Sequence, residues 1–100
     1  MHDLLKIKDF NSADITISAN GMADTPNVDI SITDYYPLGI ILQFCRNSAS
    51  GGGNYSTTNI YSYYFSSTSN YVMFQVKNYS NAQAKVFVGF RILYIKNKLI

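Results

Sequence analysis

Two stretches near the end of the chain alternate apolar residues with other residues, and this pattern constrains the fold more than any other feature. A two-residue period is typical of a strand with one buried face. Both stretches are also rich in β-branched and aromatic residues, which favour strands. The residues that share the apolar face in positions 71–77 and 85–96 are Val72, Phe74, Val76, Val86, Val88, Phe90, Ile92 and Tyr94.

The first third of the chain shows the same period in two shorter stretches. Residues 14–18 alternate, and Val28, Ile30 and Ile32 share one face of the next stretch. Asn20-Gly21 and Pro26 lie between them, and such residues are typical of turns. The sequence therefore predicts a hairpin with a long loop over residues 14–33.

Three further strands are indicated over residues 4–10, 38–44 and 59–65. Residues 38–44 are apolar at nearly every position, so both faces of that strand need cover, either from a neighbouring element or from a symmetry mate. The second face of residues 85–96 is half apolar and also indicates a subunit contact. No stretch has a helical pattern. We expect one domain over residues 1–100. Its predicted fold is an antiparallel β-sandwich of about seven or eight strands, with the jelly roll as one detailed form. Residues 1–13 are expected to form an N-terminal arm or the first strand.

Charged residues are few and unevenly placed. They make up 14% of the chain, and all six acids lie before Tyr35, whereas six of the eight bases follow it. This separation favours attraction between strands or between subunits. A basic patch for nucleic acid is the alternative, but the bases are scattered rather than clustered. We therefore expect no nucleic-acid partner.

Residues that carry catalysis are scarce. The chain has no Glu, one His at position 2, and one Cys at position 45 within an apolar strand, where a small apolar role is expected. The glycines of residues 47–54 lack the Lys-Ser/Thr pair of a phosphate-binding loop and predict a flexible connection. Asn20, Asp24 and Asp34 offer oxygen atoms for calcium but have no recognised spacing. We expect no enzymatic activity, no cofactor and no metal.

Targeting signals are also missing from the sequence. The N-terminus has no long apolar stretch with a cleavage site, so no signal peptide is predicted. No segment reaches the roughly eighteen apolar residues of a membrane helix. We expect a soluble protein without membrane insertion.

Tyrosines among Ser, Asn and Gly are the best sign of a binding function. The chain has nine tyrosines, and six of them lie between residues 47 and 81. Tyr provides a large, rigid contact surface, and its ring stacks on sugar faces. For Tyr61, Tyr63 and Tyr64 the pattern leaves a core role and an exposed role equally open, while loop positions favour exposure of Tyr55 and Tyr79. The predicted ligand-binding residues are Tyr55, Tyr79, Asn54, Tyr61 and Tyr63.

The order of these parts resembles a known group of proteins. The order begins with a polar β-hairpin ending in Tyr35-Tyr36-Pro37-Leu38-Gly39-Ile40-Ile41, continues with strands rich in Ser, Gly, Asn and Tyr, and ends with a strand closing with Ile92-Leu93-Tyr94-Ile95-Lys96. This order resembles the receptor-binding tip domains of phage or prophage tail fibres and baseplates. The resemblance implies a homotrimer that attaches to a host cell-surface saccharide or receptor, contacts other virion proteins, and is found in the virion tail or, before assembly, in the bacterial cytoplasm. The alternative function is a structural assembly subunit of a virion or similar particle, without a ligand.

Overall fold

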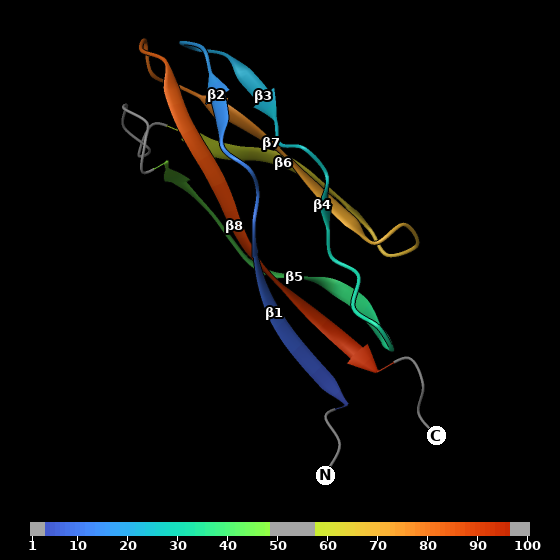
Figure 1. Ribbon diagram of the computed structural model, residues 1–100. Helices are drawn as coiled ribbons and strands as arrows, with labels where there is room; N and C mark the ends of the chain where they lie inside the picture. The colour runs from blue at the N-terminus through green and yellow to red at the C-terminus, as the bar shows by residue number, and fades with distance from the viewer. Residues whose placement is uncertain (1–3, 49–57, 97–100) are drawn as a thin grey trace.

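The protein is built from β-strands. The computed structural model describes residues 4–48 and 58–96, and within them it contains eight strands and no helix (Figure 1). The all-β prediction is therefore confirmed, with the number of strands at its upper value. The strands are β1 (Leu5–Asn11), β2 (Ile15–Ile17), β3 (Met22–Asp24), β4 (Val28–Asp29), β5 (Tyr35–Asn47), β6 (Thr58–Ser66), β7 (Tyr71–Asn78) and β8 (Ala84–Lys96).

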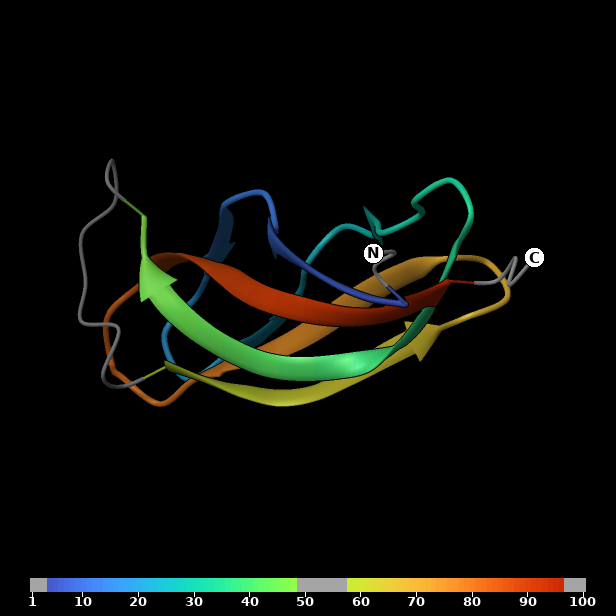
Figure 2. The same ribbon diagram turned by 90° about the horizontal axis from the view of Figure 1, so that it is seen from below.

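The strands form two antiparallel sheets that lie one over the other (Figure 2). In sheet A, β8 is central, with β1 and β2 in succession along one edge and β5 along the other. In sheet B, β7 is central, with β3 and β4 along one edge and β6 along the other. The described part of the molecule is elongated, 55 × 23 × 17 Å. Strands β5 and β6 run side by side along one long side of the sandwich.

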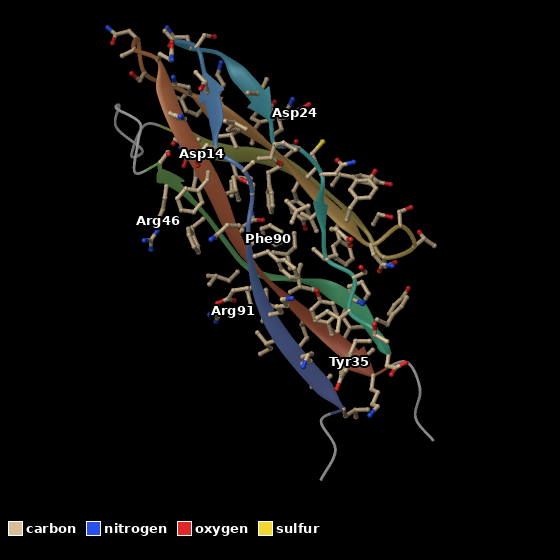
Figure 3. The ribbon with its side chains drawn as sticks, viewed as in Figure 1. Asp14, Asp24, Tyr35, Arg46, Phe90 and Arg91 are labelled. Atoms are coloured by element: carbon tan, nitrogen blue, oxygen red, sulfur yellow. The ribbon has the colours of Figure 1, made fainter. Side chains whose placement is uncertain are left out.

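The two central strands provide most of the core. The predicted inner faces of β7 and β8 are confirmed, because every one of the eight residues assigned to them is at most 1% exposed. Phe74 and Phe90 meet between the sheets with ring centroids 5.1 Å apart. Figure 3 shows Phe90 near the middle of β8, where the sheets overlap. Alternation therefore identified the buried faces correctly in both central strands.

One edge of each sheet consists of two successive strands with a gap between them. In each gap, a hydroxyl side chain accepts a hydrogen bond from a backbone N–H of the central strand. Between β1 and β2, Ser12 Oγ accepts a hydrogen bond of 2.9 Å from the Val88 N–H of β8. Between β3 and β4, Thr25 Oγ1 accepts one of 2.9 Å from the Phe74 N–H of β7. The Ser12 N–H in turn donates to the Val88 carbonyl, and the Thr25 N–H donates to the Phe74 carbonyl. No buried amide of the central strand is left unpaired at either gap, so the chain can bend there without the cost of an unmade hydrogen bond.

The predicted hairpin over residues 14–33 is wrong. Strand β2 pairs with β8 in sheet A, whereas β3 and β4 pair with β7 in sheet B. The Asn20-Gly21 turn does form, since Asn20 has a φ of 55° and the Gly21 N–H donates to the Ser18 carbonyl. It carries the chain from one sheet to the other instead of joining paired strands. Alternation predicted which side of these strands is buried but contained no information about their partners.

A tyrosine hydroxyl lies in the core at one end of the sandwich. Tyr94 is 0% exposed, and its hydroxyl donates a hydrogen bond of 2.6 Å to the Ile30 carbonyl. Burial, reinforced by the negative charge of Asp29, raises the pKa of Tyr94 from 10.0 to about 12. The folded state therefore holds the Tyr94 proton more tightly than the unfolded state does.

This pKa predicts a loss of stability in alkali. Below pH 10 both states keep the proton, and between pH 10 and pH 12 only the unfolded state loses it, so the free energy of unfolding falls over this range. We expect a fall of about 2 kcal/mol from this group. Urea unfolding at a series of pH values measures it, and Tyr94→Phe is the control. If wild type and Tyr94→Phe lose stability equally between pH 10 and pH 12, Tyr94 is not the group responsible.

Candidate binding site

Exposed apolar side chains divide by type between the two sheets. Among the described residues, the large exposed aliphatic residues of sheet A come from the N-terminal segment and the edge strand β5: Leu4, Leu5, Ile7, Leu38, Ile41 and Leu42. The exposed tyrosines lie mainly on sheet B, at Tyr61, Tyr63 and Tyr64 in β6 and at Tyr79 after β7, with Tyr36 as the exception in β5. The molecule therefore presents surfaces of two chemical kinds.

The outer face of sheet B carries a tyrosine pair surrounded by polar groups. Tyr64 of β6 and Tyr71 of β7 have ring centroids 5.6 Å apart, with planes tilted by 38°. Next to them, the Ser62 hydroxyl hydrogen bonds to Gln75 Oε1 at 3.2 Å. The register places Tyr64 opposite Met73 and Ser62 opposite Gln75, so all these side chains share one face. We call Ser62, Tyr64, Tyr71, Met73 and Gln75 the tyrosine face.

The strand tyrosines that the sequence left undecided are exposed. Tyr61, Tyr63 and Tyr64 are 62%, 53% and 52% exposed. Tyr61 is the extra residue of a β-bulge, because Ile60 pairs with Val76 and Ser62 pairs with Gln75. A bulge redirects side chains at a sheet edge. The core alternative is therefore excluded for these three residues in the folded chain.

Tyr63 belongs to a different surface from Tyr64. It lies opposite Phe74 in the register, with ring centroids 6.2 Å apart, and so follows the inner face of β6 at its open edge. Together with Ile40–Gln43 of β5 it lines an open groove of about 320 Å³. The residues that line this groove come from the edge strands β5 and β6, which run side by side in Figure 2. A ligand that crosses the β6 edge can contact Tyr63 and Tyr64 together.

Tyr79 lies at the end of the sandwich, after β7. It is 56% exposed, and Lys77 Nζ lies 5.7 Å from its ring centroid. The same Lys77 Nζ donates to the Asn20 carbonyl at 2.8 Å. Thr58 pairs with Asn78, so Tyr79 is close to the beginning of β6. The predicted residues Asn54 and Tyr55 lie outside the described residues.

Among the predicted ligand-binding residues that the structure describes, Tyr61 and Tyr63 lie in β6 and Tyr79 follows β7, and only Tyr63 lines the groove. Sequence reasoning did not include Tyr64 and Tyr71 among the site residues, although they form the closest tyrosine pair. Their positions are diagonal across the β6–β7 hairpin, since Tyr64 pairs with Met73 and Tyr71 with Ser66. Only the hairpin register brings them together, and their sequence spacing gives no signal of it.

Carboxylates are dispersed over the described residues, and three of them contact local partners. Asp9 pairs with Arg91, and the Asp14 carboxylate accepts from Ser48 at 2.6 Å. Asp29 accepts from the Ser31 N–H and hydroxyl, and these bonds lower the pKa of Asp29. In residues 4–48 and 58–96, no three His, Cys, Asp or Glu side chains come together as a metal site. The three residues considered as calcium ligands lie at different places in the fold. Asn20 and Asp24 lie near Lys77 of β7, whereas Asp34 precedes the β5 residue that pairs with Lys96 of β8.

Cys45 lies in β5 and faces the core. It is half-buried and packs against the core cluster, as predicted for a small apolar side chain. Its Sγ is 3.5 Å from Thr58 Oγ1. Burial raises the pKa of the Cys45 thiol, and the contact with Thr58 opposes this only in part. A thiol with a raised pKa is a poor nucleophile at neutral pH.

The fold and its surfaces define the protein as a two-sheet, antiparallel all-β protein with a tyrosine face on one sheet and exposed aliphatic side chains on the other. Comparison with known protein families, with curated proteins and with solved structures finds no match. The described residues include no helix of the length and apolarity needed to cross a membrane.

Proposed function

We propose that the protein is a non-enzymatic binding domain that attaches to a host cell-surface saccharide or receptor, as a homotrimeric part of a phage tail fibre or baseplate. The observation that carries this proposal is the tyrosine face, where Tyr64 and Tyr71 lie 5.6 Å apart beside the Ser62–Gln75 hydrogen bond. Aromatic rings offer an apolar surface for the C–H face of a sugar ring, and hydroxyl and amide groups pair with its hydroxyls. The tyrosine face supplies both kinds of contact.

The path of the chain supports a jelly roll as the specific form of the sandwich. The chain passes from sheet A to sheet B between β2 and β3, back to A before β5, to B before β6 and to A after β7. Repeated crossing between two antiparallel sheets is the winding of jelly rolls, which are frequent in viral and lectin domains. This arrangement leaves β5 and β6 as edge strands on the same side.

A structural assembly subunit without a ligand is the second candidate function. It is favoured by the aliphatic side chains of β1 and β5, such as Ile7 at 57% and Ile41 at 49% exposed. Exposed aliphatic clusters are typical of protein–protein interfaces. The two candidates differ in the tyrosine face, which only the binding function requires.

Replacement of Tyr64 tests the binding function. Tyr64→Ala removes an exposed ring from the tyrosine face, and we expect binding to immobilised bacterial cell-surface saccharides to weaken by about tenfold, the usual effect of losing one aromatic contact. Biolayer interferometry on those saccharides measures the change.

Tyr64→Phe is the matched control, since it keeps the ring and removes only the hydroxyl. It is expected to stay within about threefold of wild type. Because Tyr64 is 52% exposed, neither change is expected to disturb folding. Equal binding by Tyr64→Ala and wild type, on a saccharide that wild type binds, would place the ligand elsewhere.

A further inference from the structure

The outer face of sheet A has an ordered arrangement of side chains in rows across three strands. The inner residues of β8 are buried, so the alternate residues face outwards together with their pairing partners in β1 and β5. Leu5, Ile95 and Tyr36 form the first row, and Ile7 and Leu93 begin the second. The eight large side chains of this face, which we call the aliphatic face, are Leu5, Ile7, Tyr36, Leu42, Phe44, Phe87, Leu93 and Ile95.

The aliphatic face is accessible in the single chain. Ile7 and Leu5 are more than half exposed, and Leu42 and Tyr36 are 45% and 44% exposed. The four remaining members are partly covered by their neighbours. These side chains together present an apolar surface on the order of 500 Å², which is at the upper end for a monomer. A face of this size in water favours a protein partner.

The centre of the aliphatic face has a defined shape and contains an ion pair. The Phe44 ring lies so close over Gly89 that a side chain there would come within 2.4 Å of it. Beside it is a depression of about 210 Å³ lined by Asp9, Leu42 and Arg91, among other residues. Arg91 Nε donates to Asp9 Oδ1 at 2.7 Å, and Figure 3 shows Arg91 beside β1. The one ion pair at the centre of the face is thus already neutralised within the chain.

We propose that a second copy of this chain covers the aliphatic face. With the polar groups of Asp9, Asn11 and Arg91, the face reaches about 800 Å², the area that each partner buries in a stable interface. About 60% of it is apolar, as is usual for interfaces between identical subunits. A copy brings the same neutral Asp9–Arg91 pair, so this pair adds no unpaired charge to the interface. The Arg46 guanidinium lies 4.9 Å from the Phe44 ring centroid, and it can keep this contact when a copy covers the face.

This inference rests on the proposed function only in assuming an oligomer, and it uses none of the residues of the tyrosine face. Each copy that joins through sheet A keeps the outer face of sheet B free for a ligand. Several weak saccharide sites on one particle then act together, which raises the apparent affinity without a new contact.

The test is the solution mass of wild type and two matched double variants, measured by light scattering coupled to size exclusion. Ile7→Glu with Leu42→Glu places charges on the aliphatic face, on both sides of β8. Met22→Glu with Asn59→Glu adds the same charge to exposed positions of sheet B. We expect a mass of three times 11.2 kDa for wild type and the sheet B variant, whereas twice 11.2 kDa would support the interface and contradict the proposed trimer. The sheet A variant is expected to be monomeric, with self-association weakened by about 100-fold or more.

Circular dichroism spectra that match wild type show that each variant is folded. A folded Ile7→Glu/Leu42→Glu variant that keeps the wild-type mass overturns the inference and leaves the oligomer in place. A monomeric wild type overturns both the inference and the proposed trimer. Saccharide binding is measured separately on the same samples, so an oligomer that binds no saccharide contradicts the proposed function while supporting the interface.

Discussion

Replacing Asn78 with aspartate is expected to lower the free energy of unfolding by about 3–5 kcal/mol. Asn78 is 0% exposed and joins the two sheets. Its Nδ2 donates to the carbonyls of Ile17, Ser18 and Ala82 at 3.2, 3.2 and 2.9 Å. Its Oδ1 accepts the Ser80 N–H at 2.9 Å. This one side chain thus makes hydrogen bonds to backbone groups at the end of β2 and in the turn between β7 and β8.

Aspartate has the same shape but no amide donor. It places a carboxylate oxygen against the three carbonyl oxygens, and a buried charge without a partner is costly. Urea denaturation at pH 7 measures the loss. Asn59→Asp is the matched control, because Asn59 is exposed and lies opposite Lys77, and it is expected to change stability by about 0.5 kcal/mol or less. A loss below about 1 kcal/mol for Asn78→Asp would contradict the role assigned to this side chain.

Truncation of Phe74 to alanine is expected to cost about 3–5 kcal/mol. Phe74 is 0% exposed, its ring lies 5.1 Å from Phe90 of the other sheet, and Tyr63 packs at its edge. Removing the ring opens a cavity between the sheets that the surrounding rigid strands cannot close. A domain of this size has a stability of about 5–15 kcal/mol, so the change removes a large share of it.

Thermal and urea unfolding of Phe74→Ala measure this effect. Phe65→Ala is the comparison, because Phe65 pairs with Val72 on the same inner face but is only partly buried. It is expected to cost clearly less, about 1–2 kcal/mol. Equal losses for the two variants would mean that the core is not centred on the Phe74–Phe90 contact.

Much of the fold is predictable from the sequence because a two-residue period gives the buried side of a strand directly. Val28, Ile30 and Ile32 alternate with exposed neighbours, and Ile30 is 0% exposed as the pattern indicates. The period does not give the pairing partner, and for this reason the predicted hairpin over residues 14–33 was wrong. Partner choice depends on long-range contacts with β7 and β8, which follow about 50 to 70 residues later in the chain.

The site was less predictable than the fold. A tyrosine in a strand gives the same sequence pattern whether its face of the sheet is covered or exposed to solvent. The exposure of Tyr61, Tyr63 and Tyr64 is therefore known only from the structure. The bulge at Tyr61 and the diagonal contact of Tyr64 with Tyr71 depend on hairpin register. The apolar second faces of β5 and β8, by contrast, were visible in the sequence, since they break the alternation with residues such as Ile41 and Leu93.

The most direct test of the saccharide-binding claim is amide chemical-shift mapping by NMR, with the saccharide that the protein retains best on an array of bacterial cell-surface saccharides. Saturable shifts are expected in β6 and β7 around Ser62, Tyr64, Tyr71 and Gln75, with the outer face of sheet A unchanged. Shifts confined to sheet A, or an array on which no saccharide is retained, would contradict it.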